Sequence, residues 1–304
     1  MTLPKTPVAW AIRLSQILQH VQATTGENLY PIRVQDIACD ISRQFFPEAP
    51  ITKISGETFS TKFEGMLRPV PQSNGQWGII YNDAIKSRGR INFTLAHELG
   101  HYLLHRAALA DGIQCSRHDM MGWNTEYGQR EAEANQFASY LLMPRNLFEA
   151  QMNGETLSLH LMQHVADHFD VSITAAILKW IEFTNKRAML IVARDGFVDW
   201  ARSSENLFKS GVFLKPKQEN IELPALSLAA RKDKFFDNES GVQHKTGIWP
   251  FREDVQEMTL LADSYDMTIS LLLFDDQAPF RNFEEEPDEE DTFDRFNKQN
   301  TRSF

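Results

Sequence analysis

Two histidines and a glutamate in one short stretch have the spacing that can bind and use a zinc ion. His97, Glu98 and His101 form H-E-x-x-H within N-F-T-L-A-H-E-L-G-H-Y-L-L-H. On an α-helix, residues four apart share a face roughly 6 Å from each other, so both imidazoles can reach one ion. Glu98 lies one position around the helix, where its carboxylate can take a proton from a water molecule that the ion acidifies. The pattern indicates metalloprotease chemistry, and a histidine pair on a solvated helix face is the plainer alternative.

The residues around the motif favour a helix. Either Asn92 or Thr94 can cap its start. An apolar face lies beside the histidines, with spacings of three, four and seven residues: Phe93, Ala96, Gly100, Leu103 and Leu104. Gly100 costs a helix about 1 kcal/mol relative to alanine, and we expect another backbone to pack closely there in compensation.

His105 repeats the histidine spacing but is a poor third ligand. Along one helix, His97, His101 and His105 form a line of roughly 12 Å, and three points on a line cannot converge on one ion. We expect His105 to be a cation near the helix C-terminus, where the helix dipole favours positive charge. The third ligand must then come from another part of the chain.

A second amphipathic helix is predicted over Gln129–Pro144 and offers a carboxylate. Its apolar face follows helical spacing through Ala134, Phe137, Ala138, Leu141 and Leu142. At about 100° per residue, Glu131 points toward the core side, and Asn135 follows one turn later. We therefore predict Glu131 as a metal ligand and Asn135 as a hydrogen-bond partner of a ligating histidine. Glu133 points away and is interpreted as an ordinary acid of the first helical turn.

The two stretches together carry a family resemblance. H-E-L-G-H-Y-L-L-H, followed about thirty residues later by E-A-E-A-N-Q-F-A-S-Y-L-L-M-P, resembles the ImmA/IrrE family of metallo-endopeptidases over roughly residues 30–186. The resemblance implies a zincin-like fold, a catalytic Zn²⁺ (with Mn²⁺ also possible) and cleavage of a repressor-like regulator or antitoxin. It also implies that His97, His101 and Glu131 bind the metal, that Glu98 is the catalytic base and that Asn135 supports a ligand.

Composition and charge narrow the class of protein. The chain has 304 residues, a net charge of −10 and two cysteines, which favours a reducing compartment over a disulfide framework. It shows no signal-peptide pattern and no apolar run of membrane-spanning length, so we expect a cytoplasmic protein. Neither the body nor the acidic end has the basic surface typical of nucleic-acid binding, so direct DNA binding is not expected.

Strands are predicted upstream of the motif. Helical spacing over residues 8–20 and Pro31–Ile41 gives way, between Phe59 and Asp83, to two short apolar runs joined at Asn74-Gly75, a hairpin signal. The second run comes directly before the metal-binding helix, and such a strand can pair with the backbone of a peptide substrate. On that reading Trp77, Ile79 and Tyr81 bind substrate, whereas an ordinary core strand is the alternative.

Residues 106–128 separate the two predicted metal-binding helices. Cys115 and His118 could offer further ligands, but two histidines, a glutamate and water already complete an open catalytic zinc site. A packed surface loop is the favoured interpretation, with His118 and Tyr127 as weaker candidates for stabilising an oxyanion.

The remainder of the chain carries no catalytic motif. Helices are predicted at residues 145–152, Leu157–Phe169 and Ser172–Phe183, and the last two resemble a helix-turn-helix whose second helix offers only Lys179 to DNA. We interpret this pair as a packing unit under the catalytic helices. The evenly spaced His160, His164 and His168 are interpreted as exposed histidines rather than a second metal site.

After these helices, the sequence pattern changes to one typical of strands. A hairpin is predicted around Asp195-Gly196, and two strands at Met258–Leu261 and Met267–Phe274 flank Asp263–Asp266. The predicted domains are a zincin-like domain over 1–150, a helical unit over 151–186, a β-rich module over 187–278 and an acidic disordered tail over 279–304.

The sequence thus predicts an α+β, cytoplasmic, zinc-dependent endopeptidase that acts on a regulatory protein. The alternative is a non-catalytic regulatory or binding protein whose metal site is structural or vestigial. In that case the β-rich region and the acidic tail would carry the function.

Overall fold

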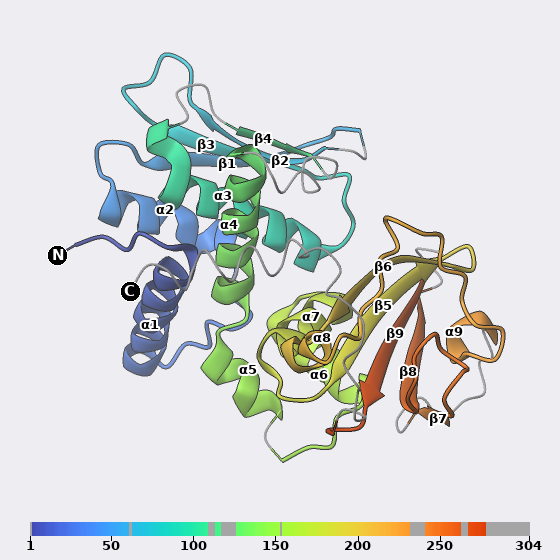
Figure 1. Cartoon of the computed structure of the whole chain (residues 1–304). Helices are drawn as coiled ribbons and strands as arrows, with labels where there is room; N and C mark the ends of the chain where they lie inside the picture. The colour runs from blue at the N-terminus through green and yellow to red at the C-terminus, as the bar shows by residue number, and fades with distance from the viewer. Residues whose placement is uncertain are drawn as a thin grey trace.

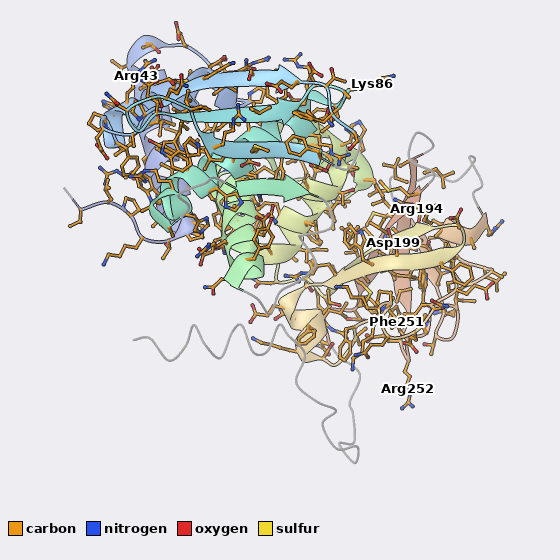
Figure 2. The ribbon with its side chains drawn as sticks, turned by 90° about the horizontal axis from the view of Figure 1, so that it is seen from above. Arg43, Lys86, Arg194, Asp199, Phe251 and Arg252 are labelled. Atoms are coloured by element: carbon orange, nitrogen blue, oxygen red, sulfur yellow. The ribbon has the colours of Figure 1, made fainter. Side chains whose placement is uncertain are left out.

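The structure is a mixed α+β arrangement built around two separate β-sheets (Figure 1). This computed structural model describes residues 2–60, 63–108, 113–116, 126–152, 154–231, 241–262 and 267–277. The acidic tail over 279–304 and the turn Asp263–Asp266 lie outside the described residues. Figure 2 shows the two parts from above, with Arg43 and Lys86 on the part around the first sheet and Arg194 and Phe251 on the other.

The first sheet, sheet A, precedes and flanks the H-E-x-x-H helix. Its strands are β1 (Ile51–Glu57), β2 (Phe63–Pro69), β3 (Trp77–Asn82) and β4 (Ile113–Ser116). Their spatial order is β1-β3-β2-β4, with β1 parallel to β3 and the other pairs antiparallel. The predicted hairpin is confirmed between β2 and β3. Its loop is longer than a two-residue turn, because Val70 and Gln76 still pair, and Gly75 adopts a positive φ of 79°.

Helices cover sheet A and meet one another in a common core. They are α1 (Pro7–Thr25), α2 (Val34–Phe45), α3 (Arg88–His105), the short 3₁₀ turn η1 (Arg106–Ala108) and α4 (Glu126–Leu142). The helix α3 lies on β2 and β3, α4 crosses α3, and α1 packs on α4. Both predicted N-terminal helices are confirmed, and each extends a few residues past its predicted end. The side chain of Thr6 caps α1 by accepting a hydrogen bond from the Ala9 N–H.

A chain of three short helices connects the two sheets. These are α5 (Arg145–Met152), α6 (Leu159–Phe169) and α7 (Ile173–Phe183), all close to the predicted ranges. The pair α6–α7 contacts strands of the second sheet, and the turn between its helices meets the start of α3. At that point a Cβ on Gly89 would collide with the carbonyl oxygen of Asp170. The helical pair therefore packs against both parts of the molecule.

The second sheet, sheet B, is fully antiparallel. It contains β5 (Ala188–Arg194), β6 (Phe197–Ser203), β7 (Val242–His244), β8 (Val255–Ala262) and β9 (Met267–Phe274) in the order β6-β5-β9-β8-β7. The hairpin at Asp195-Gly196 is confirmed, with positive φ at both turn residues. The short helices α8 (Glu205–Lys209) and α9 (Leu228–Arg231) and the strand β7 lie in a stretch predicted only to be rich in loops.

Each face of sheet B belongs to a different apolar core. Leu190, Val192 and Leu271 join the α6–α7 helices in a core that continues to α3 and α4. On the other face, Met189, Ile191 and Leu272 pack with the second core, which includes Trp249 and Phe251. Because both faces are covered, residues 188–193 of β5 are all buried, and the strand reads as a continuous apolar run.

The carboxylate of Glu257 is fully buried in the second core. Its Oε2 accepts from the Leu228 N–H at 3.1 Å and the Trp249 indole at 3.0 Å, and its Oε1 accepts from the Ala229 N–H at 3.0 Å. The Thr259 hydroxyl adds a contact of 2.8 Å, as does Nε2 of His244. Surrounded by donors, Glu257 ties α9 and the Trp249 loop to sheet B. The sequence analysis did not identify this group.

Candidate metal centre

The helix α3 positions the H-E-x-x-H residues and begins earlier than predicted. Its N-cap is Ser87, whose hydroxyl accepts a hydrogen bond from the Arg90 N–H at 3.3 Å. The predicted caps Asn92 and Thr94 are wrong, since both lie inside the helix. Asn92 instead accepts from the Val34 N–H at 2.9 Å and donates to the Ile32 carbonyl at 2.7 Å. Its side chain therefore fastens α3 to the start of α2.

The second helix, α4, crosses α3 at Gly100. A Cβ at this position would lie 2.9 Å from Phe137 Cδ1 and 3.2 Å from the Cα of Ala134. The expected close approach of another backbone is therefore confirmed. A glycine here lets α4 come near enough to bring a carboxylate to the histidines of α3.

Three side chains converge where the helices cross. Nε2 of His97 lies 3.2 Å from Glu131 Oε2, and Nε2 of His101 lies 3.1 Å from Glu131 Oε1. The two Nε2 atoms are 2.9 Å apart. All three residues are buried, and their ligand atoms lie within 4.8 Å of one another. In the part of the chain that the structure describes, this is the group of histidine, cysteine and acidic residues that could hold a metal ion.

In His97 and His101, Nδ1 is the ring nitrogen that faces away from Glu131, and in each ring it has a partner of its own. Nδ1 of His97 donates to Oδ1 of Asn135 at 2.9 Å, as predicted for Asn135. Nδ1 of His101 lies 3.0 Å from Nδ1 of His105, whose Nε2 lies 2.9 Å from Oε2 of Glu133. A carboxylate can only accept here, so His105 donates from Nε2 and accepts at Nδ1, and His101 donates from Nδ1. In both ligand candidates Nε2 is therefore the ring nitrogen that faces Glu131, and it can bind an ion once it carries no proton.

Two predictions about this outer contact are wrong. His105 is buried, and burial lowers its pKa even though Glu133 opposes the shift, so it does not act as a surface cation of the helix end. Glu133 is not in the first turn, because α4 begins at Glu126. Its carboxylate accepts from His105 across the helix crossing, a contact that only the tertiary structure reveals.

Burial and the neighbouring carboxylates shift the pKa values of the cluster in opposing directions. Burial lowers the pKa of His101 to about 4 despite its contact with Glu131. Burial also disfavours charge on His97, but its hydrogen bond with Glu131 and the charge of Glu98 outweigh this and raise its pKa. Burial would raise the pKa of Glu131, yet the contacts with His101 and His97 hold it below its usual range. A cation among these atoms meets two carboxylates and two nitrogen lone pairs.

The donor set fits zinc in type and in spacing. Two imidazole nitrogens and one carboxylate oxygen, with a position left for water, are a common ligand set of catalytic zinc. Atoms at about 2.0–2.1 Å from a shared tetrahedral centre lie roughly 3.3 Å from each other. The observed separations of 2.9, 3.1 and 3.2 Å are close to this value.

Glu98 lies beside the cluster against β2. Its side chain is fully buried, and a Cβ on Gly65 would lie 2.9 Å from Glu98 Oε1 and 2.5 Å from Thr94 Cγ2. Only glycine at position 65 leaves room for this carboxylate between the helix and the strand. The sequence analysis did not single out Gly65, although a glycine inside a strand often marks a close approach of this kind.

The predicted substrate strand is not at the edge of its sheet. The strand β3, with Trp77, Ile79 and Tyr81, pairs with β1 on one side and β2 on the other. Its backbone groups are therefore engaged, and Trp77 and Ile79 are buried in the core. The predicted pairing of a substrate backbone with this strand is wrong, because β3 is a core strand, as in the alternative. The reason is that β1 joins the sheet in parallel, which the hairpin signal alone could not indicate. Binding of substrate by the side chains of Trp77, Ile79 and Tyr81 stays a prediction.

Other candidates from the sequence lie apart from the cluster or beyond the described part. Tyr127 is exposed near the start of α4, while the Cys115 side chain and His118 lie outside the described residues. His160 and His164 are exposed on α6. Lys179 of α7 is buried, with Nζ 3.1 Å from Glu182 Oε2 and 3.2 Å from the centre of the Tyr140 ring, so it is unavailable to DNA.

Comparison with known proteins agrees with the site. Residues 49–180 match the family model of the IrrE N-terminal-like domain, Peptidase_M78, which confirms the predicted family resemblance. A solved structure of a Mycobacterium tuberculosis transcriptional regulator is similar in fold, with a TM-score of 0.50 and 14% sequence identity. The alignment covers 86% of this chain and 76% of that chain. Among curated protein sequences, none gave a significant match. Within the described residues, no helix is long and apolar enough to cross a membrane.

Proposed function

We propose that this protein is a zinc-dependent endopeptidase that cleaves a regulatory protein. The observation that carries the proposal is the convergence of His97 Nε2, His101 Nε2 and the Glu131 carboxylate beside the buried Glu98. The match of residues 49–180 to a peptidase family supports it. A repressor or antitoxin as the substrate rests on the family resemblance.

The roles of the residues follow from their contacts. His97, His101 and Glu131 hold the ion, while Asn135 and His105 fix the rings so that Nε2 faces it. A bound zinc ion supplies Lewis acidity toward a peptide carbonyl and acidifies water. Glu98 accepts the proton of the attacking water and delivers it to the amine that leaves. Its position between α3 and Gly65 keeps this carboxylate at one place beside the ligands.

The first test separates metal binding from catalysis. Protein purified without chelators should carry close to one zinc ion per chain. Glu98→Gln should keep that metal and cut more slowly by roughly 10²–10⁴-fold, the usual contribution of a general base. Metal-free native protein, or full cleavage activity in Glu98→Gln, would rule out the mechanism. Reloading metal-free protein with Zn²⁺ or Mn²⁺ in parallel assigns the ion.

The second test seeks the substrate. Proteomes of cells that carry the native protein or Glu98→Gln should differ in one shortened regulatory protein. If both variants control their target equally and no fragment differs, the non-catalytic alternative with a structural metal site is correct.

A further inference from the structure

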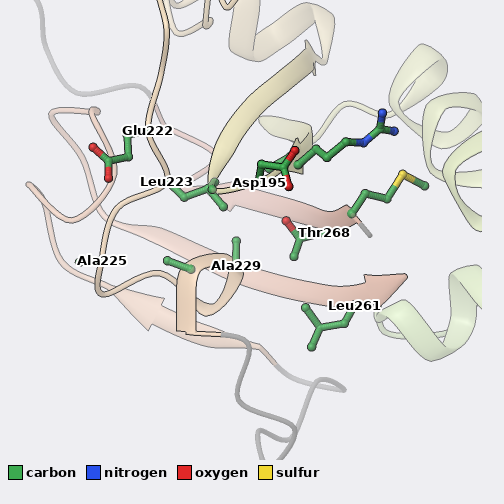
Figure 3. A pocket seen from close by; sticks show the side chains of 12 residues that line it. Asp195, Glu222, Leu223, Ala225, Ala229, Leu261 and Thr268 are labelled. Carbon is green, nitrogen blue, oxygen red and sulfur yellow. The ribbon is translucent and has the colours of Figure 1, made fainter. Parts of the chain in front are cut away.

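A hollow of about 370 Å³ opens at one end of sheet B, away from the helices that carry the metal centre. Its floor is a single row of Ala193, Thr268 and Leu261, which are register partners across β5, β9 and β8. Register partners project from the same face of a sheet. The helix α9 and the loop before it form the walls, as Figure 3 shows through Ala229, Leu223 and the neighbouring labels. The volume is within the range of small-molecule sites.

The hollow exists because its lining side chains are small. Besides Ala193 on the floor, the walls include Ala225, Ala229 and Ala230, and Gly196 lies in the β5–β6 turn. None of these can reach across to fill the space. The lining therefore offers apolar contact to a molecule from outside the chain.

One polar group in the hollow has no partner among the described residues. Thr268 is 4% exposed, and its hydroxyl makes no hydrogen bond within the described part of the chain. Ser270, the next residue on the same face of β9, bonds Thr259 at 2.8 Å, and Thr259 bonds the buried Glu257. This row of buried polar side chains thus ends at the hollow with an unsatisfied hydroxyl. Leaving such a group unpaired destabilises a fold, which suggests that a ligand pairs with it.

Charges at the mouth restrict what the ligand can be. Arg194, Asp195 and Glu222 line the opening with exposed side chains, one cationic and two anionic. None of the three makes an ion pair with another described residue, and the net negative charge of one cationic and two anionic groups disfavours an anionic ligand. The polar group at the bottom is a neutral hydroxyl, which can donate or accept one hydrogen bond.

We propose that this hollow binds a small neutral organic molecule with an apolar body and one hydrogen-bonding group. The body contacts Ala193, Ala229 and Leu261, and the polar group pairs with the hydroxyl of Thr268. The site is formed by sheet B, its β5–β6 turn, α9 and the loop before α9, so it is independent of the proposed peptidase chemistry.

Phenol is a suitable probe, because it joins an aromatic body to one hydroxyl. In the full chain with labelled alanine and leucine methyl groups, phenol should shift the NMR signals of Ala193, Ala229 and Leu261. The shifts should saturate at about 10 mM or below. Benzoate, of similar size but charged, should bind more weakly.

Two variants test the role of the hydroxyl. Thr268→Val keeps the shape of the side chain and should weaken phenol binding roughly fivefold, which is the loss of one net hydrogen bond. Thr268→Ser keeps the hydroxyl and should bind phenol like the native protein. The proposal is wrong if phenol produces no saturable shift at these methyl groups in native protein. It is also wrong if Thr268→Val binds phenol as tightly as native protein, or if benzoate binds as well as phenol.

Discussion

Glu131 and Glu257 are two buried carboxylates that each contact histidine, yet their surroundings are opposite. Glu257 accepts hydrogen bonds from two backbone N–H groups, an indole and a hydroxyl, and Nε2 of His244 lies 2.8 Å from it. Glu131 meets the Nε2 atoms of His97 and His101, whose ring protons are directed to Asn135 and His105. A carboxylate among donors stabilises a fold, whereas one that faces lone pairs favours a cation.

The largest expected effect comes from the carboxylate of the metal centre. Glu131→Gln should lower zinc affinity by roughly 10³-fold or more, beyond the 10–100-fold typical of residues that only orient ligands. It should lower the unfolding free energy of the metal-free protein by less than Glu257→Gln does, since it removes only the contacts with His97 and His101. Competition with a chelator measures the first quantity and denaturant unfolding the second. Full zinc affinity in Glu131→Gln would remove this residue from the site.

The matching substitution in sheet B should lower stability and leave zinc binding unchanged. Glu257→Gln places an amide donor among the existing donors and should lower the unfolding free energy by about 3 kcal/mol. Zinc affinity should stay at the native value, because no ligand moves. Denaturant unfolding beside Glu131→Gln provides the comparison. If both variants lose stability equally, the two carboxylates do not differ in the way described.

A smaller effect should follow from the histidine that orients His101. His105→Gln breaks the contact that fixes the His101 ring and should weaken zinc binding roughly 10–100-fold. His168→Gln, in a helix outside the cluster, is the matched control and should bind zinc like the native protein. Equal zinc affinity in all three proteins would show that His105 does not orient the ligand.

The close crossing of α3 and α4 can be tested at Gly100. Gly100→Ala places a methyl group against Phe137 and the backbone of Ala134, and overpacking of this kind costs about 1–3 kcal/mol. Because the crossing sets the distance from Glu131 to the histidines, zinc affinity should fall together with stability. A variant that loses neither would mean that the helices can separate without consequence.

The smallest effect should be a gain in stability. Thr268→Val removes a buried hydroxyl that has no partner within the described ranges, and it should raise the unfolding free energy by about 1 kcal/mol in ligand-free protein. Thr259→Val is the contrast, since its hydroxyl bonds Glu257 and Ser270 and its loss should destabilise the protein. If the denaturant midpoints of both variants moved in the same direction, the two hydroxyl groups would not differ in hydrogen bonding as described.

Local spacing was sufficient to predict most of the metal centre. The i, i+4 histidines and the apolar arc of the downstream helix are properties of single helices, so His97, His101 and Glu131 could be selected before their contacts were known. The structure brings those three side chains together. Whether they bind zinc and whether Glu98 acts as a base stay predictions.

The features that the sequence analysis did not predict have a common physical cause, because all of them depend on contacts between distant segments. The partner of His105 and the room for Glu98 depend on how α4 and β2 approach α3, and no single segment encodes those distances. The position of β3 depends on a parallel strand far earlier in the chain. Glu257 takes partners from several segments of the loop-rich region, where periodicity carries little information.

The core that runs from α3 through α6–α7 to one face of sheet B has an evolutionary consequence. A gene fusion that exchanged the C-terminal module would have to bring a compatible helical pair with it, or expose Leu190, Val192 and Leu271 to water. The family model includes α6 and most of α7 with the metal centre, so we expect inheritance to keep this helical pair with the metal-binding part and to constrain which sheet can follow it. Chimeras joined before α5 or after α7 should both yield less folded protein than the native chain, because each junction divides this core.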